Sequence, residues 1–284
     1  MPAPRYPAPV DNPTPPAVDL AAYLQRIGWA GPYAPDRETL KRLASLHTAA
    51  IPFENLNPLL RMPVPLDLVS LQAKLVAARR GGYCFEHNTL FAGVLRDMGF
   101  AVTTLAARVL WGRPEDAITP RSHMLLRVDL PEGPFIADVG FGGLTLTGAL
   151  ELKADVPQPT PHERFRLVEH EGVWRMQALV RGEWSSLYRF DLELQHAIDY
   201  EVANWYVAAN PASHFVHHLM AARALPGRRL ALMDRDFAVH ALHGDTERRT
   251  LQSPDEIAEV LEREFGIAMS DASILRERLE LFFT

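Results

Sequence analysis

The sequence of 284 residues predicts an α+β protein, and three observations support this fold class. Apolar residues recur at helical spacing through the first hundred residues. Short segments rich in β-branched and apolar residues, separated by Gly and Pro turns, follow up to about residue 195. The remainder combines helical segments with a hairpin pattern. Since domains usually hold about 100 to 200 residues, the chain fits two compact units or one elaborated unit.

Four helices are expected in residues 18–99. Asp19, Asp36 and Asp67 each precede a run with apolar residues at helical spacing, and such residues cap helix N-termini. A fourth helix is expected to begin near Cys84, because an apolar stripe with helical spacing follows it. The segment 51–60, IPFENLNPLL, is interpreted as a loop between the second and third helices.

The middle of the chain predicts a β domain, either a sheet or a barrel. Its expected strands are 101–110, 123–130, 135–141, 164–170 and 173–180. Beyond residue 196 we expect a helix, a hairpin and a last helix that begins with a capping box at Ser253. The predicted divisions are a disordered Pro-rich tail (1–17), a helical domain (18–99), a β domain (100–195), and a linker helix with an α/β unit (196–284).

Composition excludes several classes of protein. Hydrophobic residues make up 48% and charged residues 23%, a globular balance, and the net charge of -6 argues against nucleic acid or an anionic membrane as partner. The sequence contains no run of about 18 apolar residues, so it predicts no membrane-spanning helix. The first 16 residues contain seven prolines and no apolar core for a secretory signal. We therefore expect a soluble cytoplasmic protein, and a homodimer stays open.

Cys84 is the single cysteine, which excludes an internal disulfide and any site with several cysteine ligands. It follows Gly81 and Gly82 at the expected start of a helix, where partial positive charge favours a thiolate over a thiol. Arg80 adds a full positive charge nearby. This position suits a nucleophile, although a lone cysteine without such context is more often a buried core residue.

A thiolate nucleophile is commonly paired with an imidazole, which a carboxylate orients. Among the 11 histidines, His123 opens an apolar strand, and Asp138 lies among apolar neighbours where an acid needs a partner. A simple hairpin would pair Leu130 with Phe135 and set His123 opposite Gly142. His123 and Asp138 would then share a sheet face, but contact between them requires a bulge or a shifted register.

Four motifs in order carry a family resemblance: PFENL (52–56), RGGYCFEHN around Cys84, SHMLL around His123 and ADVGFGG around Asp138. Together with NWYVAANPASHF (204–215) they closely resemble the arylamine N-acetyltransferases. The resemblance implies a helical N-terminal domain, a central β-barrel and a C-terminal α/β lid, with a papain-like, cysteine-protease-type Cys-His-Asp core. It also implies acetyl-CoA as donor, an aromatic amine or hydrazine as acceptor, and a ping-pong mechanism through an acetyl-cysteine.

The resemblance further implies roles for residues around the triad. Arg80 and Glu86 are expected to pair and shape the nucleophile loop, with Asn88 as further support, unless Arg80 and Glu86 form no more than a surface ion pair. The residues expected to line the acceptor pocket are Phe53, Phe141 and Phe215. Those expected near acetyl-CoA are Gly140, Gly142, Gly143 and Ser213. The family's Ser-Thr-x-Pro-Ser-Ser segment is here 208–213, AANPAS, so three hydroxyls are missing.

Other functions stay open at this stage. His214, His217 and His218 have helical spacing, but no acid or thiol joins them nearby in the sequence, so we expect no metal site. An amide synthase of the same fold, acting on a carrier-bound acyl chain, is kept open by the missing hydroxyls at Ala208, Ala209 and Ala212. A cysteine hydrolase or a transglutaminase-like enzyme is a more distant alternative. A catalytically silent binding module is disfavoured, because all three triad residue types are present.

Overall fold

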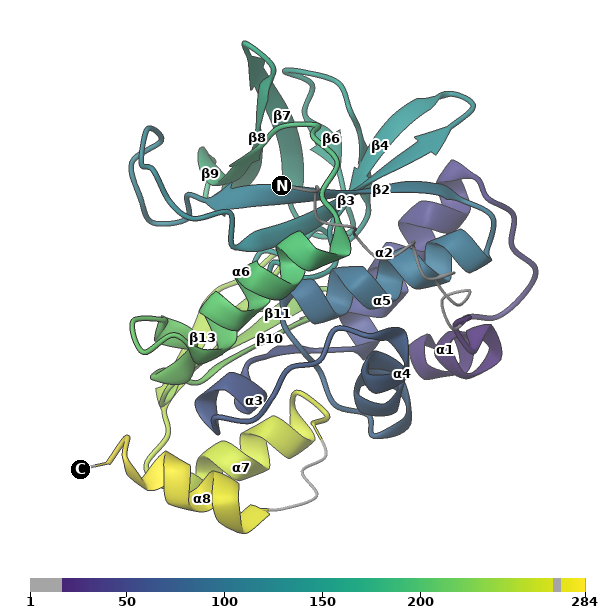
Figure 1. Ribbon diagram of the computed structural model, residues 1–284. Helices are drawn as coiled ribbons and strands as arrows, with labels where there is room; N and C mark the ends of the chain where they lie inside the picture. The colour runs from purple at the N-terminus through teal and green to yellow at the C-terminus, as the bar shows by residue number, and fades with distance from the viewer. Residues whose placement is uncertain (1–16, 268–271, 284) are drawn as a thin grey trace, which may run out of the picture.

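The computed structural model describes residues 17–267 and 272–283 (Figure 1). The predicted tail at 1–17 lies outside the described residues, apart from residue 17. The α-helices are α1 (Leu20–Ile27), α2 (Arg37–Ala50), α3 (Leu56–Leu59), α4 (Leu68–Leu71), α5 (Cys84–Asp97), α6 (Ala197–Ala209), α7 (Pro254–Arg263) and α8 (Ala272–Glu280). A π-helix, η1 (Gln72–Ala77), and a 3₁₀-helix, η2 (His214–Val216), complete the helical elements.

The strands form two antiparallel sheets. They are β1 (Phe53–Glu54), β2 (Ala101–Val109), β3 (His123–Leu130), β4 (Gly133–Ala137), β5 (Ala149–Glu151), β6 (Gln158–Pro159), β7 (Arg164–His170), β8 (Val173–Val180), β9 (Glu183–Phe190), β10 (Met220–Leu225), β11 (Arg228–Met233), β12 (Asp236–Ala241) and β13 (Thr246–Thr250).

The expected helix starts are confirmed by their caps. The Asp19 carboxylate accepts a hydrogen bond from the Ala22 N–H at 2.9 Å, and the Asp36 carboxylate accepts one from Thr39 at 2.8 Å. Ser253 caps α7 in the same way, 3.2 Å from the Glu256 N–H. Each cap satisfies a backbone donor that has no partner inside its helix.

The third expected helix is not a continuous α-helix. After one turn of α4, the chain continues as the π-helix η1. A π-turn holds an extra residue, so it rotates the side chains that follow relative to an α-helix, and such turns are frequent at functional sites. Here η1 carries Lys74, which reaches the nucleophile helix α5 through Glu86. Apolar spacing in the sequence does not reveal this change of helix type.

An eight-stranded sheet of order β5-β4-β3-β2-β9-β8-β7-β6 confirms the predicted β domain. Its edge strands β5 and β6 are joined by the Gln158 side chain, which bonds the Glu151 N–H at 2.8 Å and the Glu151 carbonyl at 2.9 Å. The sheet therefore curls into a nearly closed barrel (Figure 1). Strand β9 was not predicted, because EWSSLYRF alternates weakly, yet it connects β2 to β8.

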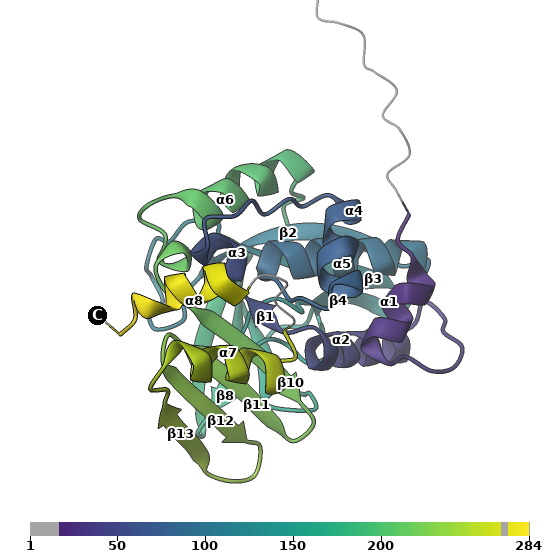
Figure 2. The same ribbon diagram turned by 90° about the horizontal axis from the view of Figure 1, so that it is seen from below.

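The second sheet has the order β1-β10-β11-β12-β13 and packs against α7 and α8 to form the C-terminal lid (Figure 2). The prediction of a loop at 51–60 was wrong, since this segment forms β1 and α3. Strand β1 pairs Phe53 with Ala222 and Glu54 with Ala221. A partner so distant along the chain leaves no local signal in the sequence. Through this pairing, a segment from the helical region becomes an edge of the lid sheet.

The apolar interior divides into three clusters of buried side chains. The first joins the N-terminal helices to strands β3 and β4 and includes Cys84; the second lies under the lid sheet, and the third fills the barrel. Within 17–267 and 272–283, none of the helices has the length and apolar character needed to cross a bilayer. The nucleophile candidate thus sits in the core that joins helices to barrel.

Candidate active site

Cys84 is the first residue of α5, as expected from the sequence. The Glu86 carboxylate accepts a hydrogen bond from the Tyr83 N–H at 3.1 Å and so caps this helix end. A Cβ atom on Gly82 would lie 2.7 Å from a Glu86 oxygen, so the tight approach to the cap requires glycine. The Cys84 side chain is nearly buried, with 5% of its surface accessible, and its Sγ donates to the Ser122 carbonyl at 3.6 Å.

The register of β3 and β4 brings His123 and Asp138 together. The predicted pairing of Leu130 with Phe135 was wrong, because Leu130 pairs with Gly133 and Leu126 with Ala137. This tighter hairpin shifts the register by an even number of residues, which keeps both side chains on one face and moves them closer along the strands. His123 Nε2 and Asp138 Oδ2 are 2.7 Å apart.

The His123–Asp138 pair is buried and charged. Burial lowers the pKa of His123, but the Asp138 charge and hydrogen bond, with a smaller contribution from Cys84, outweigh it and raise that pKa to about 10. Burial raises the pKa of Asp138, yet His123, Asn88 and the Gly140 N–H together lower it. At neutral pH the pair is therefore imidazolium and carboxylate. Since His123 Nε2 bonds Asp138, His123 Nδ1 is the ring nitrogen available to interact with Cys84.

Asn88 connects the nucleophile helix to the carboxylate. It lies one turn after Cys84 on α5, and its amide Nδ2 donates to Asp138 Oδ1 at 3.0 Å and to the Met124 carbonyl at 2.8 Å. Its Oδ1 accepts a hydrogen bond from the Val139 N–H at 3.1 Å. One fully buried amide thus fixes α5, β3 and the segment after β4 relative to one another. The expected supporting position of Asn88 is explained by these contacts.

Gly140 permits the close approach of the Asp138 loop to the nucleophile. A Cβ atom at this position would lie 2.7 Å from the Cys84 Cα and 2.9 Å from Asn88 Nδ2. Its N–H donates to Asp138 Oδ1 at 3.0 Å, so this donor already has an acceptor inside the site. Gly142 adopts a φ of 89°, and a Cβ there would lie 3.5 Å from the Phe53 ring, whereas Gly143 faces open space.

Aromatic rings surround the triad. Phe141 contacts His123 edge-on with 5.2 Å between ring centroids, and Tyr188 lies 4.8 Å from His123 on the same measure. Phe53 and Phe215 are neighbours, 6.3 Å apart. Tyr188 was missed by the sequence reasoning because it lies on the unpredicted strand β9. Burial and the Asp138 charge raise the pKa of Tyr188 well above its ordinary value, so its phenol stays neutral.

The expected pairing of Arg80 with Glu86 was wrong. Arg80 instead donates to Glu54, with its Nη2 2.6 Å from Oε1, and to Asn57 at 3.1 Å. Glu86 pairs with Lys74, whose Nζ lies 2.7 Å from Oε1. Both carboxylates are buried, and each needs a cation of its own because an unpaired buried charge is costly.

Ser213 and the nearby histidines have internal partners. The Ser213 hydroxyl donates to the Val207 carbonyl at 2.6 Å and accepts from the Phe215 N–H at 3.3 Å, which fixes the segment carrying Phe215. His217 bonds the Pro211 carbonyl at 2.7 Å, and His218 lies 2.8 Å from Asp234. No group of three or more potential metal ligands gathers in the described part of the chain.

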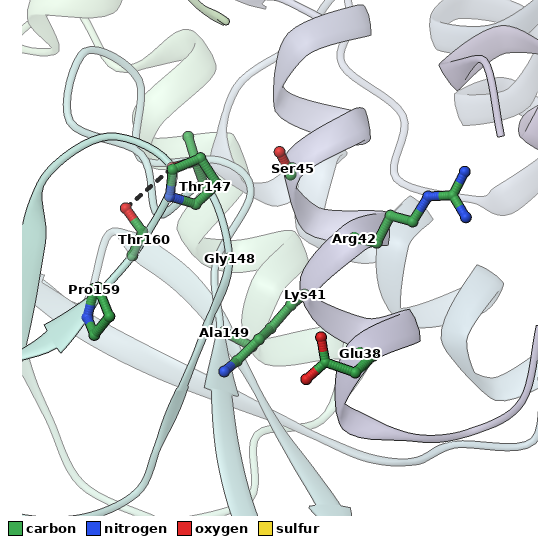
Figure 3. Close-up of a pocket in the computed structure, with 10 residues that line it drawn as sticks. Glu38, Lys41, Arg42, Ser45, Thr147, Gly148, Ala149, Pro159 and Thr160 are labelled. Atoms are coloured by element: carbon green, nitrogen blue, oxygen red, sulfur yellow. Dashed lines mark hydrogen bonds between the residues drawn. The ribbon is translucent and has the colours of Figure 1, made fainter. Parts of the chain in front are cut away.

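Two of the surface clefts formed by the described residues lie beside α2 and α6. One, of about 420 Å³, is lined by residues that include Ser122 and Tyr200 of α6. The other, of about 310 Å³, lies between α2 and the loop 147–149, with Lys41 and Glu38 projecting from the helix side (Figure 3). The lining of neither cleft includes Cys84, His123 or Asp138.

Comparisons with known proteins agree with this geometry. A family model described as N-acetyltransferase matches residues 36–274. The chain is 44% identical over 259 residues to the arylamine N-acetyltransferase of Mycolicibacterium smegmatis, covering 90% of this chain and 94% of that protein. It is 43% identical over 254 residues to the Escherichia coli K12 enzyme of the same name, covering 89% and 90%.

The solved structure of Mycobacterium marinum arylamine N-acetyltransferase in complex with CoA has a TM-score of 0.89 and 40% identity, covering 93% of this chain and 99% of that one. The fold class expected from the sequence, with helices, barrel, lid and papain-like core, is thereby confirmed. The model match, the identities and the shared fold extend over nearly all of the described chain, and so this protein belongs to the arylamine N-acetyltransferase family.

Proposed function

We propose that this protein transfers the acetyl group of acetyl-CoA to the nitrogen of arylamines, arylhydrazines or hydrazides by a ping-pong mechanism. The observation that carries the proposal is the thiol of Cys84 at the start of α5, next to a buried His123–Asp138 pair with 2.7 Å between its nitrogen and oxygen. Family membership supplies the chemistry, since the named relatives are arylamine N-acetyltransferases and one solved relative holds CoA.

In the first half-reaction the Cys84 thiolate attacks the thioester carbonyl of acetyl-CoA. His123 is charged at neutral pH, so it donates its proton to the departing sulfur of CoA. The products are acetyl-Cys84, CoA thiol and a neutral imidazole. Asp138 keeps the ring oriented and stabilises its charged form without taking the proton.

In the second half-reaction the neutral His123 removes a proton from the amine as its nitrogen attacks acetyl-Cys84. The thiolate leaves, the amide departs and the imidazolium is restored, so the cycle closes without an external acid or base. The oxyanion of each tetrahedral intermediate would be stabilised by the Cys84 N–H, which lies in the first turn of α5, where N–H groups have no acceptor within the helix.

The substrate-contacting residues belong to the same proposal. Phe53, Phe141 and Phe215 offer flat apolar surfaces for an aryl group, since Phe53 contacts Phe215 and Phe141 contacts His123. Gly142 and Gly143 are the better candidates for the donor side, because the Gly140 N–H already binds Asp138. Ser213 would contribute by holding Phe215. No metal is needed for this chemistry, and acetyl-CoA acts as co-substrate.

Intact mass spectrometry tests the proposal. Acetyl-CoA alone should add one acetyl group to the wild-type protein and none to Cys84→Ala. An aminobenzoate or a hydrazide added afterwards should remove that group and yield the N-acetyl product. Absence of the adduct with fresh acetyl-CoA would refute the proposal.

The same experiment separates the alternatives. Labelling by a carrier-bound acyl chain, without labelling by acetyl-CoA, would indicate an amide synthase. The residues that keep this open are Ala208 and Ala209, at the end of α6, and Ala212, which carry no hydroxyl for a donor. Rapid release of acetate in the absence of amine would indicate a hydrolase.

Location and assembly are proposals of the same kind. We place the enzyme in the cytoplasm, since its donor and an unpaired nucleophilic thiol both suit a reducing compartment. A homodimer stays a prediction, which sedimentation velocity over a range of protein concentrations tests.

A further inference from the structure

The first turn of α5 carries the Cys84 thiol and the Glu86 carboxylate, and the negative charge of Glu86 disfavours ionisation of the thiol. Cys84 needs positive potential to be a thiolate, and the helix N-terminus supplies part of it. Two residues later stands Glu86, a carboxylate with 1% of its side chain accessible. A buried negative charge at this position opposes the thiolate, because like charges raise the pKa of an acid.

Glu86 is required for the shape of the loop. Its Oε2 accepts the Tyr83 N–H, and it fills the space against which Gly82 packs. These are contacts of an oxygen atom, and a neutral amide oxygen can accept the same hydrogen bond. The negative charge of Glu86 is therefore separable from its capping role.

Lys74 faces this carboxylate from η1. Its Nζ lies 2.7 Å from Glu86 Oε1, and 16% of its side chain is accessible. Glu54 pairs with Arg80 at 2.6 Å, yet it still raises the pKa of Glu86, and Lys74 lowers the pKa of both carboxylates. Burial lowers the pKa of His87 to about 4, so this neighbour is neutral. Tyr83 and Tyr200 also face this region, and burial raises the pKa of each, so both stay neutral. His123 is the cation on the barrel side.

We propose that Lys74 is a positioning residue for the nucleophile: it neutralises the Glu86 carboxylate, so that the cap shapes the loop without suppressing the Cys84 thiolate. The π-helix gives Lys74 the rotation that brings it over α5. The inference rests on the proposed function in one respect, that Cys84 reacts as a thiolate.

If Lys74 and Glu86 compensate each other's charge, removing either one should shift the pH midpoint of Cys84 reactivity in opposite directions. Burial raises the pKa of Glu86, and Lys74 opposes this shift. At a pH above the raised pKa of Glu86, Lys74→Met leaves the carboxylate charged and uncompensated, and it should raise the apparent pH midpoint of Cys84 reactivity by about one unit. At a pH below both midpoints this lowers the reaction rate about tenfold. Glu86→Gln leaves the cation uncompensated and should lower the midpoint. The double variant Lys74→Met with Glu86→Gln carries neither charge and should return close to the wild-type midpoint.

The experiment measures the rate of Cys84 alkylation by iodoacetamide against pH, using intact mass. Because Cys84 is the single cysteine, each thiol adduct reports on it alone. Lys41→Met, at a half-buried lysine of α2 that lines the second cleft, is the matched control and should leave the midpoint unchanged. If Lys74→Met does not fold, Lys74→Gln and Lys74→Arg replace it, and the arginine variant should keep the wild-type profile.

The outcomes are distinct. Equal midpoints in all variants, or shifts of the same sign in both single variants, would overturn the proposal, since a purely structural role gives no rescue by the double variant. Alkylation needs no acetyl-CoA. A wild-type protein that shows the signed shifts but forms no acetyl adduct would refute the proposed function and leave this inference standing.

Discussion

Asp138 is a buried acid whose two oxygens are held by different parts of the chain. Oδ2 meets His123, while Oδ1 accepts from Asn88 and from the Gly140 N–H. Hydrogen bonds to the ionised form favour it, which is why the Asp138 pKa stays low despite complete burial. At the scale of single residues, reactivity therefore depends on contacts that Cys84 itself does not make.

Asn88→Ala tests the amide that links α5 to Asp138. The change removes the donor to Asp138 and leaves the Met124 carbonyl and the Val139 N–H without their partner. Unsatisfied buried groups cost about 1 to 3 kcal/mol each, so we expect a loss of unfolding free energy of about 2 to 4 kcal/mol. The rate of Cys84 acetylation should fall and its acid limb move to higher pH. Urea denaturation and the pH profile of acetylation measure the two effects; unchanged values of both would contradict this role.

Gly140→Ala tests the close approach at the nucleophile. Its Cβ would lie 2.7 Å from the Cys84 Cα, which is backbone and must shift. We expect the turnover number to fall at least about tenfold, because small displacements of catalytic groups are costly. Gly148→Ala is the control, since its Cβ would meet Thr160 at an ordinary 3.9 Å. Comparable activity of the two variants in a steady-state assay would show that this packing does not matter.

At the scale of elements, β1 decides how the helical region, the lid and the nucleophile loop meet. It pairs with β10 of the lid, and the Glu54 N–H donates to the Gly82 carbonyl at 2.7 Å on its other side. The motifs around Phe53 and Cys84 were recognised in the sequence, but their contact was not. The sequence also supplied the helix caps and most barrel strands, because those depend on neighbouring residues.

Arg80→Met tests the ion pair that joins these elements. Glu54 is fully buried, and removing its partner leaves an uncompensated charge. We expect a loss of about 3 to 5 kcal/mol of unfolding free energy. Arg263→Met is the matched control, because the Arg263–Glu259 pair on α7 is exposed, with 76% and 53% of the side chains accessible. It should change stability by under about 0.5 kcal/mol. Chemical denaturation compares the two, and equal losses would refute the expectation.

At the scale of the whole molecule, a buried hydrogen-bonded chain links α1, α2 and α5. The Pro52 carbonyl can only accept, so His87 Nε2, 3.1 Å away, carries the proton. His87 Nδ1 then accepts from His47 Nε2 at 2.8 Å, and His47 Nδ1 accepts from the Tyr23 hydroxyl at 2.8 Å. All of these groups are neutral. The hydrogen bonds are donated in one direction, from Tyr23 through His47 and His87 to the Pro52 carbonyl.

The buried histidines of this hydrogen-bonded chain predict a loss of unfolding free energy in acid. Burial lowers the pKa of His87 to about 4 and that of His47 well below its ordinary value. The unfolded chain binds these protons near pH 6.5, so the stabilisation is complete above that pH and declines as pH falls toward 4. His87 alone should contribute about 3 kcal/mol of this decline. His123 behaves oppositely: its raised pKa gives stability that is present below pH 6.5 and lost as pH rises through about 10.

Urea denaturation at a series of pH values checks the acid loss. His87→Gln, which cannot be protonated, should reduce the slope of unfolding free energy against pH between 6.5 and about 4. His170→Gln, at an exposed histidine, should leave the slope unchanged. Identical slopes in wild type and His87→Gln would refute the prediction.

The sequence by itself determined the order of helices, barrel and lid, the family, and which Cys, His and Asp are the candidate triad, because capping, strand alternation and short motifs depend on residues close together in the chain. The tertiary structure decided the hairpin register, the place of β1, the entry of Tyr188 into the site, and the partners of Arg80 and Glu86. These depend on which distant segments meet, and a buried charge takes whichever counter-ion the packing brings within reach.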